Sequence, residues 1–421
     1  MVTAMCPGGG KARPKGGIVR VCRLECRMRI AFYAPLKSPT HPTPSGDRRV
    51  GRLLMDALRL GGHAVELASE FRSFEGIGDP VQQTLIRNEG GVIADRLLEQ
   101  WLAGAHQERP EVWFSYHLYY KAPDWIGPRV SKVLGIPYVV AEASYATKRA
   151  SGPWAQGHTA TRDAIQAASL LLCPTQHDVA GLQQVAVAPT LVVSLPPFLN
   201  PAPYRLAAQT RYGHRASLGV AHGLPVQAPW LVVVAMMRSG DKLASYRQLA
   251  QALERLMDLP WQILVVGDGS ARAEIQALLE QAAPGRARFL GERGGDELVA
   301  IYAASDIFIW PSVNEAYGMA MLEAQAAGVP VVSCAVRGVP DVVCDGRTGL
   351  LAAPDDAAGL AQLTRELLLD STRRVAMGQA AAQFVFEERS VEGAARLLNV
   401  ALGDLKSHFP MTTRRTMHVP V

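Results

Sequence analysis

The chain has 421 residues and a mass of 45.4 kDa, a length typical of two or three domains. Apolar residues make up 48% and charged residues 19%, which excludes an extensively disordered chain. No run of 18 uninterrupted apolar residues occurs, so we expect no membrane-spanning helix. The net charge of +5 would suit a nucleic acid or an anionic membrane if a folded domain carried it.

The positive charge is concentrated at the two ends of the chain. Residues 1–27 contain six basic residues and one acidic residue, and residues 406–421 contain three basic residues and no acidic one. The body between them is therefore slightly acidic, and we expect no nucleic-acid partner. Peripheral contact of the basic ends with an anionic membrane stays open.

The leader, residues 1–27, lacks the continuous apolar segment and the small-residue cleavage site of a secretory signal. We expect it to be a disordered leader, or an upstream extension before a natural start at Met28. We expect a cytoplasmic protein that can also contact the inner membrane surface peripherally.

The first half of the chain alternates short apolar runs with helical patterns. Because strand, helix and strand in succession are typical of a parallel sheet covered by helices, we predict an α/β domain over residues 28–200. The predicted strands are 29–34, 63–68, 112–116, 137–141 and 170–173, with helices over 50–60 and 129–134.

The pattern restarts after a segment with four prolines, residues 195–203, which indicates a linker. A second α/β domain is predicted over residues 201–385, followed by a helix over 386–405 that packs back toward the first domain and a basic tail over 406–421. Its predicted strands are 230–235, 262–266, 288–290, 307–310 and 329–333, with helices over 243–257, 273–279 and 318–327. The fold class is therefore α/β, with two Rossmann-like doubly wound domains facing a cleft, where ligands bind beyond the carboxyl ends of the strands.

The most informative stretch is residues 310–332. A buried strand ends at Pro311, a polar loop carries Glu315, and a helix with Glu323 begins near Gly318. The amino terminus of a helix attracts phosphate, and a glycine there allows close approach to the backbone. A carboxylate ahead of the helix can accept hydrogen bonds from sugar hydroxyls, and one inside it can bind a ribose.

This stretch resembles the family 4 glycosyltransferases of the GT-B fold, whose signature is two glutamates separated by seven residues. The resemblance extends over about residues 28–402 and implies a retaining transfer of sugar from a nucleotide diphosphate sugar to an acceptor hydroxyl. Besides Glu315 and Glu323, it rests on Gly328–Val332, Val266–Gly269, Phe289–Gly291, Ser305–Asp306, Gly338–Val343 and Asp345–Leu350.

The resemblance implies a role for each matching residue of the second domain. Lys242 and Arg238 would neutralise the diphosphate, Arg238 being one place away from the family's usual spacing. Glu315 would bind the sugar and Glu323 the ribose. Further donor contacts are expected from Gly267, Asp268, Gly291, Tyr317, Gly318 and Met319. No two aspartates stand two apart, so we expect neither a metal nor another cofactor.

In the first domain, Gly46 lies in the loop after the first strand, where the family approaches the donor phosphate or the acceptor. His117 resembles the histidine that the family places near the transferred sugar, although a lone histidine can also be structural. Asp47 is either a helix-start residue or an acceptor-side residue. Glu142, at the end of another strand, is a second acceptor-side candidate.

The predicted function is a metal-independent retaining glycosyltransferase of the hexosyltransferase type, acting in polysaccharide biosynthesis, with a saccharide or lipid-linked glycan as acceptor. A sugar-nucleotide epimerase of the same fold is the main alternative, followed by a catalytically silent module that binds nucleotide sugars. A dinucleotide oxidoreductase is disfavoured because Gly267-Asp268-Gly269 lacks the full G-x-G-x-x-G spacing.

Overall fold

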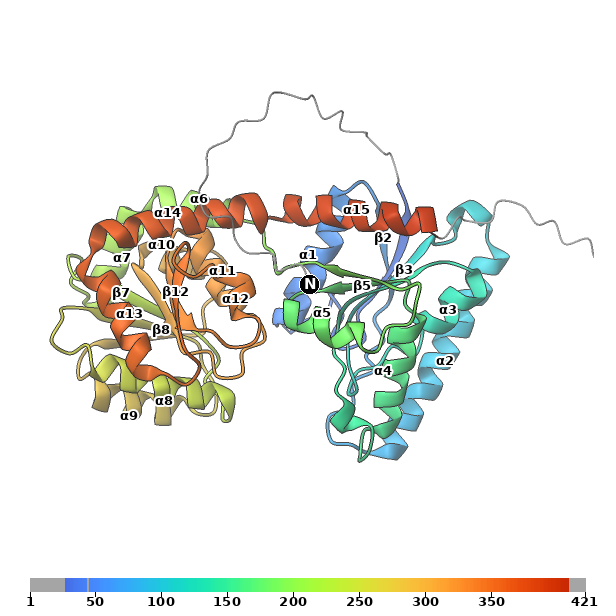
Figure 1. The fold of residues 1–421 in the computed structure, drawn as a ribbon, viewed down its shortest axis with the longest axis horizontal. Helices are drawn as coiled ribbons and strands as arrows, with labels where there is room; N and C mark the ends of the chain where they lie inside the picture. Colours follow the sequence, from blue (N-terminus) through green and yellow to red (C-terminus); the bar gives the residue numbers. More distant parts are fainter. Residues whose placement is uncertain (1–26, 44, 409–421) are drawn as a thin grey trace, which may run out of the picture.

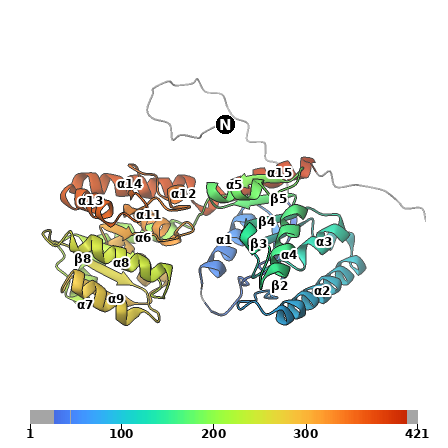
Figure 2. The same cartoon turned by 60° about the horizontal axis from the view of Figure 1, so that its bottom comes forward.

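The computed structural model describes residues 27–43 and 45–408, and these form two α/β domains side by side (Figure 1). The first domain carries the amino-terminal half, and the second domain carries most of the remainder. Figure 2 shows the same two lobes from another side, with α1 on the side of the first domain that faces the second. The predictions for residues 1–26 and for the end of the basic tail lie outside the described residues.

The first domain contains a parallel sheet in the order β2-β1-β3-β4-β5-β6. Its four central strands are apolar and buried, as expected for a parallel sheet covered on both faces, whereas its two edge strands are only partly buried. The strands are β1 (Arg29–Tyr33), β2 (Ala64–Ser69), β3 (Val112–Leu118), β4 (Tyr138–Ala143), β5 (Leu170–Cys173) and β6 (Leu191–Ser194). The helices are α1 (Gly46–Leu60), α2 (Pro80–Ala103), α3 (Gly127–Leu134), α4 (Ala155–Ala167) and α5 (Gln176–Gln183), with short 3-10 helices at His106–Glu108 and Thr147–Arg149.

The second domain contains a parallel sheet in the order β12-β11-β10-β7-β8-β9. Read from β9, this is the strand order of a Rossmann fold. The strands are β7 (Trp230–Val234), β8 (Gln262–Val266), β9 (Ala287–Gly291), β10 (Ile307–Trp310), β11 (Val331–Cys334) and β12 (Gly349–Ala352). The helices are α6 (Ala202–Gln209), α7 (Arg211–His222), α8 (Asp241–Glu254), α9 (Arg272–Ala282), α10 (Gly295–Ala304), α11 (Met319–Ala326), α12 (Val339–Val342), α13 (Ala357–Leu369) and α14 (Ser371–Glu388).

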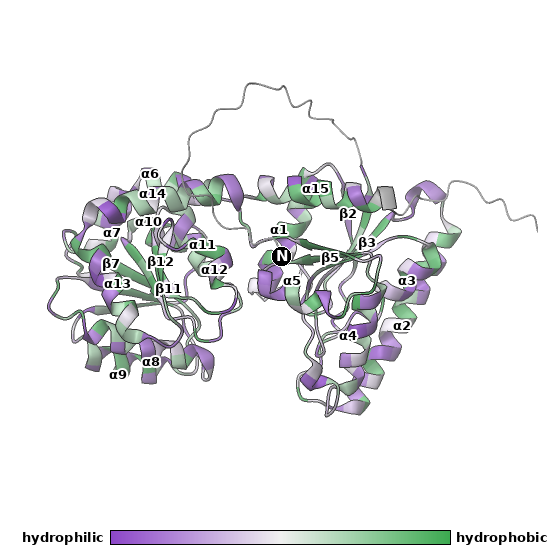
Figure 3. Ribbon diagram, viewed as in Figure 1, coloured by the Kyte–Doolittle hydropathy of each residue, from purple (hydrophilic) through white to green (hydrophobic). Residues whose placement is uncertain are grey.

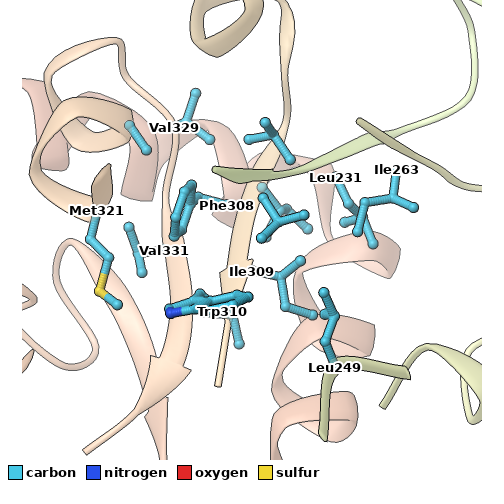
Figure 4. Close-up of a cluster of buried hydrophobic side chains, with 14 of the residues drawn as sticks. Leu231, Leu249, Ile263, Phe308, Ile309, Trp310, Met321, Val329 and Val331 are labelled. Carbon is cyan, nitrogen blue, oxygen red and sulfur yellow. The ribbon is translucent and has the colours of Figure 1, made fainter. Parts of the chain in front are cut away.

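Each sheet is the centre of its domain's apolar core. Figure 3 shows apolar residues along the strands and mixed residues on the outer faces of the helices. In the second domain, Leu231, Ile263, Phe308 and Ile309 from neighbouring strands belong to one cluster of buried side chains (Figure 4). The predicted α/β fold of two doubly wound domains is confirmed.

Several predicted boundaries shift, among them the last helix, which begins at Val391 and not at Phe386, and two of the shifts have clear local reasons. The strand β11 begins at Val331 rather than Val329, because Pro330 has no N–H to donate to a neighbouring strand. The helix α8 begins at Asp241, before the predicted start, because Gly240 adopts a φ of 82° and Asp241 places a carboxylate at the positive end of the helix. Lys242 therefore lies in the first turn of α8 and not in a loop.

Two chain segments connect the domains, and they pair with each other. The Leu199 N–H donates to the Arg389 carbonyl at 3.0 Å, and the Val391 N–H donates to the Leu199 carbonyl at 2.9 Å. The second segment leads into α15 (Val391–His408), which runs back across the first domain beside α1 (Figure 1).

The helix α15 is part of the first domain's core. Leu398 and Leu402 are fully buried there. At the edge of this contact, Nε2 of His63 lies 2.9 Å from Oδ1 of Asn399, and the Asn399 amide donates to the Gly61 carbonyl. Among the described residues, none of the helices has the length and apolar composition needed to cross a membrane.

Candidate active site

The centre of the second domain's candidate site is the point where the strand order reverses. The strands β7 and β10 are neighbours there, and the chain leaves them toward opposite sides of the sheet, which opens a crevice at their carboxyl ends. Lys242 follows β7 and Glu315 follows β10. The Lys242 Nζ lies 2.5 Å from Oε2 of Glu315, and each side chain is less than one-fifth exposed. The crevice therefore contains a partly desolvated ion pair.

The loop that carries Glu315 is held in an unusual conformation. Ser312 and Asn314 have φ values of 67° and 52°, which side-chain-bearing residues rarely adopt. The Val313 N–H donates to Oγ of Ser245, and the Asn314 amide donates to Asp241 at 2.8 Å, so α8 fixes the loop. Strain of this kind is common at functional sites, where surrounding contacts compensate for it.

A glycine turn follows β8 next to this crevice. Gly267 and Gly269 have φ values of 136° and 148°, and a Cβ atom on either would lie 2.0 Å or 2.3 Å from a backbone oxygen of the β7 loop. Only glycine fits both positions. The Gly267 N–H donates to the Gly291 carbonyl, which places the turns after β8 and β9 together. Asp268 is exposed and bonds the Gly269 N–H and Arg272, within its own turn.

Glu323 lies in α11, which begins directly after Gly318, a glycine with φ of 77°. Its Oε2 accepts a hydrogen bond from the Tyr302 hydroxyl at 3.0 Å, and its Oε1 accepts one from the guanidinium of Arg49, in α1 of the first domain. Burial raises the pKa of Glu323, while Arg49 and Tyr302 oppose that rise without cancelling it. The second predicted carboxylate is thus buried and paired across the cleft.

The first domain has a matching reversal of strand order between β1 and β3. Asp47, in the first turn of α1, lies there with its Oδ1 2.8 Å from Nδ1 of His117, near the end of β3. Oε1 of Glu142, in the next strand β4, is 3.8 Å from the same nitrogen. Three of the predicted residues therefore form one cluster.

The charges of this cluster influence one another. Burial alone would lower the pKa of His117, but Glu142 and Asp47 more than offset it, so that pKa lies above its usual value. Burial would raise the pKa of Asp47, yet the hydrogen bond and charge of His117 hold it below its usual value. The pKa of Glu142 is raised by burial, against the attraction of His117.

Tyr317 joins the two halves of the site. Its hydroxyl donates to Oε2 of Glu142 at 3.3 Å from the loop that precedes α11. Tyr317 and Met319 also line a small cavity with Tyr116 and Glu142 of the first domain. The cleft therefore brings the residues predicted from the two domains into contact.

Within the described residues, two predicted site residues form no side-chain hydrogen bond or ion pair with the other site residues. Arg238 is exposed in the loop after β7 and has no hydrogen-bond or ion-pair partner in the described part of the chain. Gly46 is the first residue of α1 rather than a loop residue, because the hydroxyl of Ser45 accepts the Arg48 N–H and starts the helix there. Open space surrounds Gly46 on the side where a Cβ would lie.

Sequence reasoning missed Arg49, Tyr302 and Trp310 as site residues. Nε1 of Trp310 donates to Glu315 at 3.4 Å, and Lys242 lies 5.5 Å from the Trp310 ring centroid. Trp310 ends a predicted strand and lies next to the two-glutamate signature, and this position could have identified it as a site residue. No pattern links Arg49 with Glu323, 274 positions away.

Within residues 27–43 and 45–408, no group of three or more histidine, cysteine, aspartate or glutamate side chains is arranged to hold a metal ion. A large cavity opens at the opposite ends of the second domain's strands, where Arg211 and Arg215 both pair with Asp306. These arginines also bond carbonyls at the end of α10, so they serve the fold.

Comparisons with known proteins bear on the family and the fold of the chain. Residues 228–370 match the family model of glycosyl transferases group 1. The chain is 42% identical over 123 residues to a D-inositol 3-phosphate glycosyltransferase of Corynebacterium aurimucosum, covering 29% of each chain. It is 35% identical over 174 residues to the protein of that name from Nocardia farcinica, covering 40% of this chain and 38% of the relative. The aligned part thus spans less than half the length of these relatives.

Solved structures of similar fold cover nearly the whole chain. A glycosyltransferase from Rickettsia africae superposes with a TM-score of 0.69 at 15% identity, over 92% of this chain and all of that one. Sucrose-phosphate synthase from Thermosynechococcus elongatus superposes with a TM-score of 0.67 at 18% identity, over 91% of this chain and all of that one. Anabaena HepE in complex with UDP-glucose superposes with a TM-score of 0.63 at 16% identity, over 90% of this chain and all of that one. The chain therefore has the GT-B fold, and its residues 228–370 match the model of glycosyl transferases group 1.

Proposed function

We propose that the chain is a retaining glycosyltransferase that moves a hexose from a nucleotide diphosphate sugar to the hydroxyl of a saccharide or lipid-linked glycan. The observation that carries this proposal is the Lys242–Glu315 pair at the strand-order reversal of the group 1 glycosyltransferase domain. A cation and a carboxylate side by side suit the two parts of such a donor, its diphosphate and its sugar hydroxyls.

The donor would bind the second domain. The diphosphate would draw Lys242 away from Glu315, and Arg238, which has no partner in the described part of the chain, would reach the same phosphates. These cations would stabilise the negative charge that develops on the leaving diphosphate, so the proposed reaction needs no metal. Glu315 would then be free to accept hydrogen bonds from the sugar, and Glu323 from the ribose.

The acceptor would bind the first domain, near Asp47, His117 and Glu142. With Nδ1 of His117 held by carboxylates, its Nε2 is free to donate to an oxygen of the transferred sugar. Closure of the two domains would exclude water, which limits hydrolysis of the donor. We propose that the reaction takes place in the cytoplasm, with the basic ends suited to an anionic membrane that carries a lipid-linked acceptor.

The first test is a thermal-shift screen with UDP, GDP, ADP and NAD. A ligand at 100 times its dissociation constant adds about 2.7 kcal/mol to the free energy of unfolding. We expect one nucleoside diphosphate to stabilise the protein and NAD to have no effect. Stabilisation by NAD alone would contradict the proposal.

The second test measures turnover of the matching nucleotide sugars. Release of nucleoside diphosphate should depend on an added acceptor, and Lys242→Ala should reduce it by at least 100-fold. Arg286→Ala, a matched change at a cation that bonds the Met257 and Leu259 carbonyls outside the cleft, should retain turnover. Conversion of the donor sugar without any acceptor would instead identify an epimerase.

A further inference from the structure

The carboxylate that the proposed function assigns to the donor ribose is held by a residue of the other domain. Nη1 of Arg49, in α1, donates to Oε1 of Glu323, and Nη2 donates to the Tyr204 hydroxyl at 2.8 Å. The Tyr302 hydroxyl donates to Oε2 of Glu323 at 3.0 Å. Glu323 therefore accepts hydrogen bonds from two helices, α1 of the first domain and α10 of the second, and Tyr204 of α6 holds Arg49.

Arg49 is the cation that faces this carboxylate in the described part of the chain. The side chain of Glu323 is 7% exposed, whereas that of Arg49 is 45% exposed. The other titratable groups facing it, Tyr302 and Tyr204, are neutral phenols whose pKa values are raised by burial. A buried carboxylate without a counter-ion takes up a proton, so the ionisation of Glu323 depends on Arg49.

An ionised carboxylate is the better partner for a ribose. It accepts hydrogen bonds at about four lone-pair positions, and here Arg49 and Tyr302 use two of them. Hydroxyl groups donating to the remaining positions would form charge-assisted bonds, which are about twice as strong as neutral ones. A protonated Glu323 would lose both the charge and one acceptor position.

We infer that Arg49 is a positioning residue for the donor, which reaches across the cleft to keep Glu323 ionised and oriented toward the ribose hydroxyls. The inference rests on the proposed function and adds a first-domain residue to the donor site. Because Asp47 lies two positions earlier on the same helix, α1 would serve the donor ribose and the His117 cluster together. The donor site is complete only when the first domain stands where it does here.

The experiment compares UDP with 2′-deoxy-UDP, which lacks one ribose hydroxyl, by calorimetric titration at pH 6.5 and pH 8.5. If the screen selects GDP or ADP, that nucleotide and its 2′-deoxy form are used. The wild type should prefer the ribonucleotide by about tenfold at both pH values, a ratio that corresponds to about 1.4 kcal/mol. Arg49→Ala should weaken this preference, and more so at pH 6.5 than at pH 8.5, because Glu323 without its counter-ion takes up a proton more readily at the lower pH.

Three further variants sharpen the test. Arg49→Lys, which restores a cation, should keep the preference at both pH values. Arg49→Gln, which keeps hydrogen-bond donors without charge, should behave like Arg49→Ala, and serves in its place if that variant does not fold. Arg59→Ala removes another exposed arginine of α1, paired with Asp56 outside the cleft, and should match the wild type.

Four results would overturn the inference. If the wild type binds a nucleoside diphosphate without preferring the ribose form, Glu323 does not read the 2′-hydroxyl. An equal loss for both nucleotides in Arg49→Ala would mean that Arg49 contacts the phosphates. Tighter nucleotide binding by Arg49→Ala would mean that Arg49 competes with the ribose for Glu323. An unchanged preference of Arg49→Ala at pH 6.5 would mean that Arg49 does not contribute to ribose recognition. Absence of nucleotide binding by the wild type would instead reject the proposed function itself.

Discussion

His117 and Glu142 lie opposite each other on neighbouring parallel strands, and both have left-handed backbones, with φ values of 58° and 60°. The residues on either side pair in register, Tyr116 with Ala141 and Leu118 with Ala143. Each strand is thus distorted at the same level of the sheet. The two side chains meet there, with the imidazole nitrogen 3.8 Å from the carboxylate, at the cost of strain in both strands.

The first prediction concerns the pH dependence of stability. The folded-state pKa of His117 is raised, so its contribution to stability is fully present below the unfolded value of about 6.5 and is lost as pH rises through the folded value. Replacing it by glutamine should therefore lower the melting temperature by about 2 °C more at pH 5.5 than at pH 8.5. Thermal unfolding at the two pH values measures this. His106→Gln, in an exposed 3-10 helix, is the control. A larger loss at pH 8.5 would contradict the charged state assigned to His117.

The second prediction separates the two members of the Lys242–Glu315 pair. Since Glu315 attracts Lys242 in the free protein, Glu315→Gln should strengthen the binding of UDP, or of whichever nucleoside diphosphate the screen selects, by about 2- to 5-fold while it abolishes transfer. Lys242→Ala should weaken UDP binding by about 10-fold or more. Titration with UDP and the transfer assay test the two effects separately. Weaker UDP binding by Glu315→Gln would mean that this carboxylate supports the nucleotide rather than the sugar.

The third prediction concerns the glycine turn after β8. Gly267→Ala should destabilise the protein by about 3 kcal/mol or more, because its Cβ would lie 2.0 Å from the Ala235 carbonyl oxygen in addition to the backbone strain. Gly285→Ala is the matched control, since Gly285 also has a positive φ, 69°, but has open space around it, and should cost about 1 kcal/mol. Denaturant unfolding compares them. Equal costs would show that the close approach to Ala235 does not matter.

The fourth prediction tests the contribution of α15 to the first domain. Leu398 is fully buried against that domain, so Leu398→Ala should lower the free energy of unfolding by about 2 to 5 kcal/mol. Its neighbour Leu397 is 44% exposed, and Leu397→Ala should cost about 0.5 kcal/mol. Chemical denaturation of both variants provides the comparison. Similar losses would contradict the burial of this helix face.

The strands could be predicted because buried parallel strands are short apolar runs between turn residues, and the runs ending at Cys173, Val266 and Trp310 match the structure at both ends. The strand β6 was not predicted, since Leu191–Ser194 is only half-buried and lies close to the linker. The long helix α2 was also missed, because its apolar residues do not gather on one face.

The site residues likewise divide into those that a local sequence pattern indicates and those that depend on how distant segments meet. The resemblance assigned Glu315 and Lys242 to the same donor, and the structure brings them together because each follows one of the two central strands of a doubly wound sheet. The sequence left Asp47 between two roles, and the structure assigns the helix cap to Ser45 and brings Asp47 to His117. Arg49 could not be predicted, since its contact with Glu323 depends on how two domains meet, and no local pattern encodes that.

The return of α15 to the first domain has a consequence for synthesis on the ribosome. The last strand of the first domain, β6, ends at Ser194, but α15, which covers an apolar face of that domain, starts only at Val391. At about 5 to 20 residues per second, roughly 200 residues take about 10 to 40 s to be made. During that interval the nascent first domain exposes the surface that Leu398 and Leu402 later cover, and it completes its fold only after the second domain has been translated.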